Sequence, residues 1–202
     1  MKKIGICGSS GSGKGYVCSI FKEYGIAHID TDLVYREKTV VPNSLCLKEL
    51  VFAFGDEILN NDGTLNKSEL AKIVFEGEGK DLKRELLNQI THKHIKIDTE
   101  NIIAELEKQS IKAVLIDAPL LFESGFDKMC NFTICVTAND EIKLERIVER
   151  DRISKEKALA RLVTQLPDSE LRLLCDYEIK NDSSSDIQEQ IALILKQENL
   201  IC

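Results

Sequence analysis

Glycines, serines and a lysine are concentrated in the stretch "GSSGSGK" near the N-terminus. Four residues separate Gly8 from Gly13, and Lys14 follows directly, which is the spacing of a phosphate-binding loop. The glycines let the backbone curl so that successive N–H groups point at phosphate oxygens, and the helix that follows adds its positive N-terminal end. The lysine side chain reaches the β- and γ-phosphates. The spacing therefore predicts a loop that binds nucleotide phosphates.

The stretch departs from the usual pattern directly after the lysine. The usual next residue is Ser or Thr, whose hydroxyl coordinates Mg²⁺, but this chain has Gly15. Ser12 lies inside the loop at the wrong position to replace that hydroxyl directly, and the hydroxyl of Tyr16 stands too far from the backbone. Two outcomes follow from the sequence. Either water, phosphates and a carboxylate elsewhere hold Mg²⁺, or metal binding is weakened.

Carboxylates follow two apolar runs of the chain. Asp30 and Asp32 stand in "HIDTD", and Asp117 ends the run in "VLIDAP". Because ligands of parallel sheets bind at the carboxyl ends of the strands, we expect these groups to lie near the loop. A carboxylate there can orient or deprotonate an acceptor hydroxyl, or hold a metal through water. The alternative is that Asp32 caps an expected helix over residues 33–38.

Arginines are frequent in the helical stretch 139–175. Arg146 and Arg150 are four residues apart and share a helix face, and Arg161 lies on the next expected helix. Their guanidinium groups can neutralise the charge of transferring phosphates. The alternative is a solvent-exposed face on which the arginines pair with neighbouring acidic residues: Glu145, Glu149 and Glu156.

Apolar runs alternate with helical patterns along much of the chain, which indicates a parallel sheet with helices on both faces. The expected strands are residues 2–8, 26–30, 112–119, 131–137 and 177–181. Helices are expected over residues 14–24 and 187–198, with "NDSSSD" (181–186) as a turn before the second. The region 43–109 interrupts the alternation with helical spacing only. We therefore expect a single three-layer α/β domain over 1–202 that contains a helical insertion.

Composition limits the function classes. The chain has 202 residues with 43% hydrophobic and 30% charged residues, as in ordinary globular proteins. A net charge of −7 argues against a general nucleic-acid binder. The seven cysteines form no CxxC pair and indicate reduced thiols in a cytoplasmic protein. No signal peptide and no apolar run of membrane-spanning length is visible, so no membrane partner is expected, and the expected state is a monomer or weak homo-oligomer.

The combination of "HIDTD" and "VLIDAPLLFE" with the glycine loop resembles the dephospho-coenzyme A kinase family. The resemblance extends, in order, over nearly the whole chain. It includes "FGDEILNNDGTLNKSELAKIVF" (54–75), "THKHI" (91–95), "LERIVERDRISKEKALARLVTQ" (144–165) and "CDYEIKNDSS" (175–184). One departure is Lys93, which stands where the family pattern has proline.

This resemblance implies a P-loop NTPase fold with a five-stranded parallel sheet, a helical substrate-binding insertion and a helical lid. It implies an enzyme that uses ATP and Mg²⁺ to phosphorylate the 3′-hydroxyl of dephospho-coenzyme A, the last step of coenzyme A synthesis. The helices of 43–109 would bind the coenzyme A moiety, and 139–175 would form the lid.

Site roles follow from the same resemblance. The implied catalytic residues are Asp32 as general base, Lys14 and Arg146. The implied ATP-binding residues are Gly8, Ser9, Gly11, Ser12, Gly13, Lys14, Gly15, Tyr16, Arg150 and Asn181, with the segment from Asn181 onward near adenine. The implied acceptor-binding residues are Asp32, Arg36, His92, Pro119, Leu120, Phe122 and Glu123. The implied metal ligands are Asp32 and Asp117.

Other readings of the same residues stay open. A nucleoside monophosphate kinase-like enzyme shares the helical insertion and the arginine-rich lid. A nucleotide-binding protein with impaired turnover is supported by Gly15 and Tyr16 alone. A GTPase is disfavoured because "NKSE" (66–69) lacks the final Asp of a guanine-reading motif and follows no strand. His92 and His94 flank a lysine in a helical pattern and would equally suit a polar surface.

Overall fold

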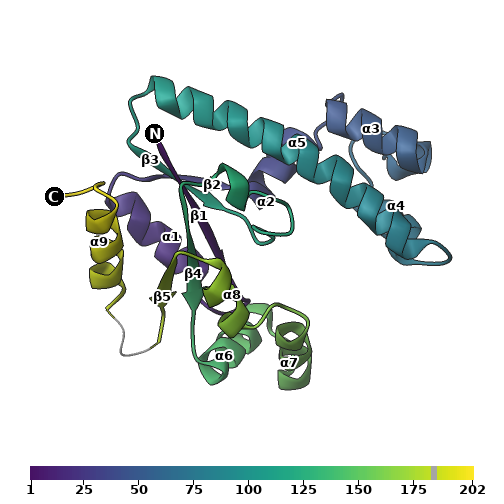
Figure 1. Ribbon diagram of the computed structural model, residues 1–202. Helices are drawn as coiled ribbons and strands as arrows, with labels where there is room; N and C mark the ends of the chain where they lie inside the picture. Colours follow the sequence, from purple (N-terminus) through teal and green to yellow (C-terminus); the bar gives the residue numbers. More distant parts are fainter. Residues whose placement is uncertain (183–185) are drawn as a thin grey trace. The chain divides into compact units, whose positions relative to one another are not determined.

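The computed structural model describes residues 1–182 and 186–202. Half of the expected turn at 181–186 therefore lies outside the described residues. The chain forms two compact units (Figure 1). The first comprises Met1–His28 and Leu106–Cys202, and the second comprises Ile29–Glu105.

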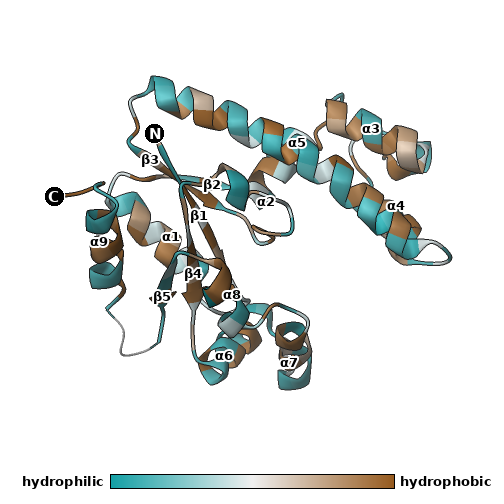
Figure 2. Ribbon diagram, viewed as in Figure 1, coloured by the Kyte–Doolittle hydropathy of each residue, from teal (hydrophilic) through white to brown (hydrophobic). Residues whose placement is uncertain are grey.

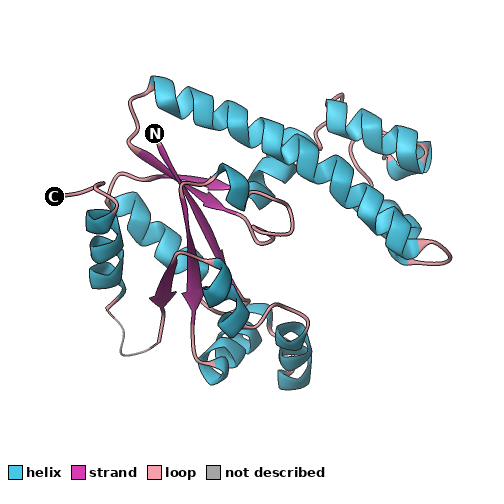
Figure 3. Cartoon of the chain, viewed as in Figure 1, coloured by secondary structure: helices cyan, strands magenta, loops and turns pink. Residues whose placement is uncertain are grey.

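A five-stranded sheet forms the centre of the first unit, with the strand order β2-β3-β1-β4-β5 (Figure 3). The strands are β1 (Lys2–Gly8), β2 (Ala27–Asp30), β3 (Ala113–Asp117), β4 (Phe132–Thr137) and β5 (Tyr177–Lys180). All five lie within the runs expected from the sequence. β1 pairs in parallel with β3 and β4, and β4 pairs in parallel with β5. The α/β fold class with a five-stranded parallel sheet is confirmed.

The register of the sheet brings chemically important strand ends to one edge. Ile6 of β1 is opposite Asp117, and Gly8 is opposite Val136 of β4. On the far side of β4, Thr137 is opposite Lys180. Because all these strands run in the same direction, their carboxyl ends share this edge. The glycine loop therefore leaves the sheet beside Asp117 and beside the ends of β4 and β5.

Helices α1 (Lys14–Glu23) and α9 (Ile187–Gln197) pack on the sheet in one buried apolar cluster (Figure 2). The residues of β3 and β4 are buried throughout, including Thr133 and Thr137, as expected for strands that are covered on both faces. Phe21 of α1 and Ile191 of α9 are fully buried. Each such side chain stabilises the fold by about 1.5–3 kcal/mol. Gly25 follows α1 with a φ of 74°, as expected for a glycine that ends a helix.

Three further helices complete the first unit: α6 (Asp140–Asp151), α7 (Lys155–Val163) and α8 (Asp168–Leu174). Helix α6 packs against α7, and α8 packs against β4. Side chains cap the first two helices, since Asn139 accepts from the N–H of Glu141 and Ser154 accepts from that of Lys157. The stretch 139–175 is thus helical, as its sequence pattern predicts.

The second unit is helical after Ile29 and Asp30, the end of β2. Its elements are α2 (Thr31–Val34), a π-helical turn η1 (Tyr35–Thr39), α3 (Leu45–Phe54), a 3₁₀ turn η2 (Asp56–Ile58), α4 (Lys67–Phe75) and most of α5 (Lys80–Lys108). Leu50, Ile58 and Val74 lie in its apolar cluster and are fully buried. An isolated antiparallel bridge joins Leu59 to Leu65. The helical character expected for 43–109 is therefore present.

The expectation that Asp32 caps the helix after β2 is wrong. The Asp30 side chain, rather than that of Asp32, accepts from the backbone N–H groups of Asp32 (2.9 Å) and Leu33 (3.1 Å). Asp30 has the extended backbone of an N-cap because the strand ends there, and the helix begins at Thr31 instead of residue 33. Asp32 lies in the first turn of α2, so its carboxylate is not the N-cap of this helix.

All seven cysteines lie in the described ranges and are free thiols. Four of them are buried, as the apolar context of several predicts. Among the described residues, no helix is both long enough and apolar enough to cross a membrane.

Candidate active site

The glycine loop joins the end of β1 to the start of α1. Gly11 and Gly13 have φ values of 80° and 82°, a left-handed conformation that side chains rarely adopt. A Cβ at Gly11 would lie 2.5 Å from the carbonyl oxygen of Lys143, and one at Gly13 would collide with the side chain of Asn181. Both positions therefore need glycine for conformation and for space.

Arg146 and Asn181 bind the backbone carbonyls of this loop. The Nη1 atom of Arg146 donates to the carbonyls of Gly11 and Ser12, at 3.3 Å each, and its Nη2 donates to the carbonyl of Asn181 at 3.1 Å. The Asn181 Nδ2 donates to the Ser12 carbonyl at 2.8 Å. The C=O and N–H of a trans peptide point in opposite directions, so this arrangement turns the N–H of Gly13 away from both side chains.

The start of α1 suits an anion. Gly13 precedes the helix and supplies no side-chain cap, and the first turn contains no acidic residue. The helix therefore presents free N–H groups and a positive dipole end next to Lys14. The loop fits the phosphates of a nucleotide in geometry and in charge.

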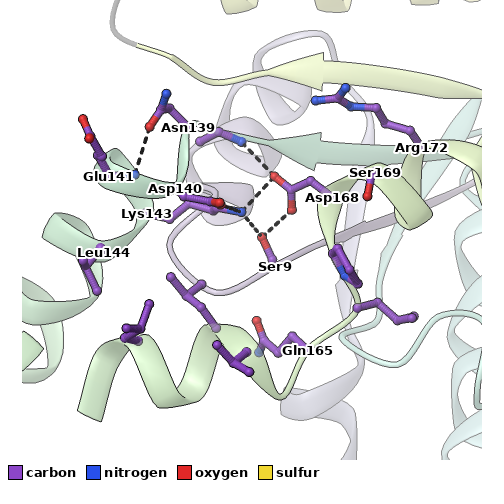
Figure 4. A pocket seen from close by; sticks show the side chains of 16 residues that line it. Ser9, Asn139, Asp140, Glu141, Lys143, Leu144, Gln165, Asp168, Ser169 and Arg172 are labelled. Atoms are coloured by element: carbon purple, nitrogen blue, oxygen red, sulfur yellow. Dashed lines mark hydrogen bonds and ion pairs between the residues drawn. The ribbon is translucent and has the colours of Figure 1, made fainter. Parts of the chain in front are cut away.

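A network of charged and polar side chains around the buried Lys143 contacts the glycine loop (Figure 4). Ser9 donates its hydroxyl to Asp168 Oδ1 at 2.7 Å. Lys143 is 4% exposed, and its Nζ lies 3.0 Å from Asp168 Oδ2 and 2.7 Å from Asp140 Oδ1. Gln165 Oε1 accepts from the backbone N–H of Ser10 at 2.7 Å. These contacts connect the loop to α6, to α8 and to the segment between α7 and α8.

The Lys143 ammonium stays charged in this setting. Burial lowers the pKa of Lys143, but hydrogen bonds to Asp140 and Asp168 outweigh burial and raise that pKa above its ordinary value. The network lines a cavity of about 610 Å³ whose other wall is apolar. The apolar lining residues are Leu144, Leu159, Leu162, Val163, Leu166 and Pro167.

Lys14 forms an ion pair with Asp117, from Nζ to Oδ1. Asp117 is buried at the end of β3. Burial raises the pKa of the Asp117 carboxyl, but the nearby His28 ring and the positive charge of Lys14 outweigh burial and hold that pKa below its ordinary value. The carboxylate is therefore ionised at neutral pH, and it offers an oxygen ligand that suits Mg²⁺.

A second cavity, of about 260 Å³, lies beside the glycine loop. Gly8 and Ser9 of the loop form part of its wall. The rest includes four residues that the sequence assigns to the acceptor: Pro119, Leu120, Phe122 and Glu123. The structure thus brings this segment and the phosphate loop to one cavity.

The arginines of the expected lid have two different environments. Arg146 contacts the loop, as described above. Arg150 donates to Ser10 Oγ at 3.3 Å and pairs with Asp151 at 2.8 Å, and Arg161 pairs with the same Asp151. The two arginines lower the pKa of Asp151 to about 2. The expectation that these arginines pair with Glu145, Glu149 and Glu156 is therefore wrong. Arg150 and Arg161 instead share Asp151, the last residue of α6.

The unusual residues after Lys14 face solvent. Gly15 has no heavy atom of the described residues within 4 Å of the position that a Cβ would take. Tyr16 is 60% exposed. Ser12 Oγ is buried and has no hydrogen-bond partner among the described residues. Gly15 supplies no side-chain oxygen and Tyr16 is mostly exposed, so neither replaces the usual hydroxyl, whereas Asp117 offers a carboxylate beside Lys14.

Asp32, Arg36 and His92 belong to the second unit, and their roles stay predictions. Within that unit, Arg36 Nε donates to the Asp32 carbonyl at 3.3 Å. The polar-surface interpretation is wrong for His94, which is buried and bonds Glu49 Oε2 through Nε2 at 2.6 Å. The long helix α5 turns His94 towards α3, which carries Glu49.

Sequence reasoning missed Lys143, Asp168 and His28. Lys143 is one of many lysines on expected helices, and nothing in its spacing marks it as buried. Asp168 follows a proline at the start of α8, where an acidic residue is common for its effect on the helix dipole alone. His28 alternates with apolar neighbours in β2, so its contact with Asp117 depends on the pairing of strands.

A glycine loop between strand and helix, a lysine paired with a strand-end carboxylate, and arginines on the loop define a P-loop kinase. The family model described as dephospho-CoA kinase matches residues 2–187. A dephospho-CoA kinase of Listeria monocytogenes serovar 1/2a is 37% identical over 197 residues, 97% of this chain and 96% of that protein. The chain belongs to the dephospho-CoA kinase family, which confirms the expected enzyme class.

Solved structures agree with this assignment. A dephospho-CoA kinase from Campylobacter jejuni matches with a TM-score of 0.69 and 26% identity, over 98% of each chain. A protein from Thermus thermophilus, TT1252, matches with a TM-score of 0.78 and 26% identity, over 100% of this chain and 98% of that one. The likeness to these structures therefore extends along the whole chain.

The Lys143 network predicts a specific loss in one variant. In Lys143→Met, the Asp168 carboxylate, whose side chain is 12% exposed, loses its buried ion partner, so we expect a loss of about 2 kcal/mol in the free energy of unfolding. ATP should also bind more weakly, because Asp168, the hydrogen-bond partner of Ser9, loses the ammonium that holds it in place. Urea unfolding and calorimetric ATP titration measure the two effects.

The exposed Lys157→Met is the matched control and should change neither quantity. The double variant Lys143→Met/Asp168→Asn should recover part of the stability because it also removes the negative charge that Lys143 balances. Unchanged unfolding and ATP affinity in Lys143→Met would show that the network does not hold the loop.

Proposed function

We propose that this protein transfers the γ-phosphoryl group of ATP to the 3′-hydroxyl of dephospho-coenzyme A, which completes coenzyme A. The observation that carries the proposal is that one cavity is lined both by the phosphate loop and by the segment Pro119–Glu123. A kinase needs its phosphoryl donor and its acceptor side by side. Family membership supplies the identity of the acceptor.

In this proposal the loop and Lys14 bind the ATP phosphates. The backbone N–H groups of the loop and of the first turn of α1 accept the phosphate charge. Lys14, which is paired with Asp117 in the structure, moves its ammonium to the β- and γ-phosphates when ATP binds. The Lys14 ammonium thereby exchanges the Asp117 carboxylate for phosphate oxygens, so it keeps an anionic partner throughout.

Asp117 and Asp32 are the residues that would hold Mg²⁺. When bound, the ion neutralises charge on the β- and γ-phosphates. Since Gly15 supplies no hydroxyl, the remaining ligands are water and phosphate oxygens. Carboxylate and water ligands are those that Mg²⁺ ordinarily keeps.

The protein's other contributions are positioning and charge. Asp32 takes the proton of the 3′-hydroxyl as general base. Arg146 and Arg150 stand at the loop, where guanidinium groups neutralise charge that develops on the transferring phosphoryl group. Release of Arg150 and Arg161 from Asp151 would make both guanidinium groups of the lid, 139–175, available to the phosphates.

The acceptor occupies the cavity at Pro119, Leu120, Phe122 and Glu123. Leu120 and Phe122 offer apolar surface, and Glu123 can accept hydrogen bonds from ribose hydroxyls. The helices of 43–109, together with Arg36 and His92, bind the remainder of the coenzyme A moiety. The basic side chain of Arg36 suits the diphosphate of that moiety.

We further propose that the reaction takes place in the cytoplasm, in a monomer or weak homo-oligomer. Free cysteines are typical of a reducing compartment. The net charge of −7 gives no reason to expect a nucleic-acid partner.

The first prediction is acceptor-dependent turnover. The purified protein with ATP, Mg²⁺ and dephospho-coenzyme A should release ADP at about 1–100 per second, the usual range for kinases. A coupled ADP assay measures this rate. Nucleoside monophosphates as acceptors are the control and should give little ADP. ATP binding without acceptor-dependent ADP would instead support a protein that has lost turnover.

The second prediction concerns Asp32. Because Asp30 provides the cap of α2, Asp32→Asn should leave the fold and ATP affinity nearly unchanged. It should lower kcat by about 10²–10⁴-fold if the carboxylate acts as general base. Steady-state kinetics and ATP titration separate the two effects.

Asp30→Asn is the matched control for Asp32→Asn, because asparagine caps helices as well as aspartate does. It should keep most of the activity. Equal losses of kcat and ATP affinity in Asp32→Asn would point to a structural role for Asp32.

The third prediction tests the missing hydroxyl. Gly15→Ser fits without displacing a neighbour, because the space around Gly15 is open. If the serine hydroxyl adds about 1.4 kcal/mol to Mg²⁺ binding, the Mg²⁺ concentration for half-maximal activity should fall about tenfold. Gly15→Ala adds the same Cβ without the hydroxyl and should not produce the fall. An unchanged Mg²⁺ dependence in Gly15→Ser would mean that the other ligands suffice.

A further inference from the structure

Three different ligand-bearing side chains meet behind the phosphate loop. Cys18 lies on α1, His28 on β2 and Asp117 at the end of β3, all within the first unit. One ligand atom from each lies within 4.8 Å of the other two. Cys18 Sγ is 3.7 Å from Asp117 Oδ2, and His28 Nε2 is 3.5 Å from the same oxygen. The three atoms form a small triangle.

The cluster is enclosed by the fold. Cys18 is 2% exposed, and Asp117 is also buried. The His28 side chain is 15% exposed, but its Nε2 is fully covered and makes no well-formed hydrogen bond to any described residue. A buried ring nitrogen without such a bond is costly, and a ligand that accepts its lone pair would remove the cost. The phosphate-binding role of the loop does not require this nitrogen.

The spacing of the ligand atoms suits a tetrahedral zinc ion. Zinc bonds of about 2.3 Å to sulfur and about 2.0–2.1 Å to nitrogen and oxygen imply ligand–ligand distances of roughly 3.3–3.6 Å. The separations of Asp117 Oδ2 from His28 Nε2 (3.5 Å) and from Cys18 Sγ (3.7 Å) are close to that range. Small side-chain rotations would close the triangle around an ion, and water would complete the four ligands.

The donor types select the class of ion. Thiolate and imidazole ligands favour zinc and related transition metals, whereas Mg²⁺ prefers an all-oxygen set. Asp117 and an ionised Cys18 would together balance the double charge of the ion. We propose that Cys18, His28 and Asp117 form a binding site for Zn²⁺ or a closely related ion, and that its occupation inhibits the kinase.

The thiol is protonated until the ion binds. Burial and the negative charge of Asp117 raise the pKa of Cys18 to about 12. The metal therefore displaces a proton from Sγ, which leaves to solvent as the sulfur–metal bond forms. His28 binds as neutral imidazole through Nε2.

Inhibition follows from the two oxygens of one carboxylate, and this step rests on the proposed roles of Lys14 and Asp117. Oδ1 pairs with Lys14, and Oδ2 faces Cys18 and His28. An ion on Oδ2 would hold Asp117 away from the Mg²⁺ that accompanies ATP. Its charge would also repel the Lys14 ammonium from the strand end. Zinc would thereby disturb the loop without competing for the phosphates directly.

Binding is tested on the protein alone, without ATP or acceptor. Zn²⁺ is titrated against a chromophoric chelator, and Co²⁺ is added separately to record thiolate-to-cobalt absorption. Cys18→Ala should weaken Zn²⁺ binding by at least about tenfold and abolish the thiolate band, and His28→Gln should also weaken binding. The buried Cys46→Ala, in the second unit, is the matched control and should bind as the wild type does.

Zn²⁺ should raise the melting temperature of the wild type and of Cys46→Ala but not that of Cys18→Ala, since only an intact site stabilises the folded state. Wild-type Zn²⁺ affinity in Cys18→Ala, or a cobalt spectrum without the thiolate band, would overturn the site. If Cys18→Ala does not fold, His28→Gln decides the question, and unchanged affinity in that variant would overturn the site as well.

Inhibition is tested by ADP production at fixed ATP, Mg²⁺ and acceptor with increasing Zn²⁺, followed by a chelator. The acceptor's own thiol binds zinc equally in every sample, so the comparison is the ratio of activity with zinc to activity without it. This ratio should fall reversibly for the wild type and Cys46→Ala and stay near one for Cys18→Ala. Equal inhibition of all three would overturn the regulatory claim. Absence of ADP without zinc would instead refute the proposed function and leave the binding result standing.

Discussion

The backbone of the glycine loop is held from outside by groups that bind its carbonyl oxygens, and the remainder of the site depends on this constraint. A loop with left-handed residues at Gly11 and Gly13 has many alternative conformations in isolation. Arg146 and Asn181 restrict it through the Gly11 and Ser12 carbonyls. The peptide N–H groups then remain for an anion. The first turn of α1 and Lys14 extend that anion site along one direction.

Charge in this site is arranged in pairs that a substrate can replace. Lys14 is paired with Asp117, and Arg150 and Arg161 are paired with Asp151. In the proposed mechanism, these pairs keep each cation near the loop until ATP binds. Lys143 differs because it is buried and held by Asp168 and Asp140, which makes it part of the framework. Cations that can exchange partners thus lie close to a cation that stabilises the fold.

Asp117 contacts both the phosphate loop and a separate pair of side chains within the fold. One carboxylate oxygen faces the lysine of the loop, and the other faces a thiol and an imidazole. The second set of contacts is unnecessary for phosphoryl transfer, which needs positioning and charge neutralisation. Two sets of contacts on one carboxylate are the physical basis of the zinc inhibition that we propose.

The sequence by itself determined the strands, the loop and the family, because apolar periodicity, the G-x-x-x-x-G-K spacing and the ordered motifs are local properties of the chain. The tertiary structure decided the pairings. The cap at Asp30, the burial of Lys143 and His94, the shared Asp151 and the meeting of Cys18, His28 and Asp117 all join different elements or depend on where a strand ends. Such contacts follow from sheet register and helix packing, which bring together residues whose separation along the chain carries no signal of their distance.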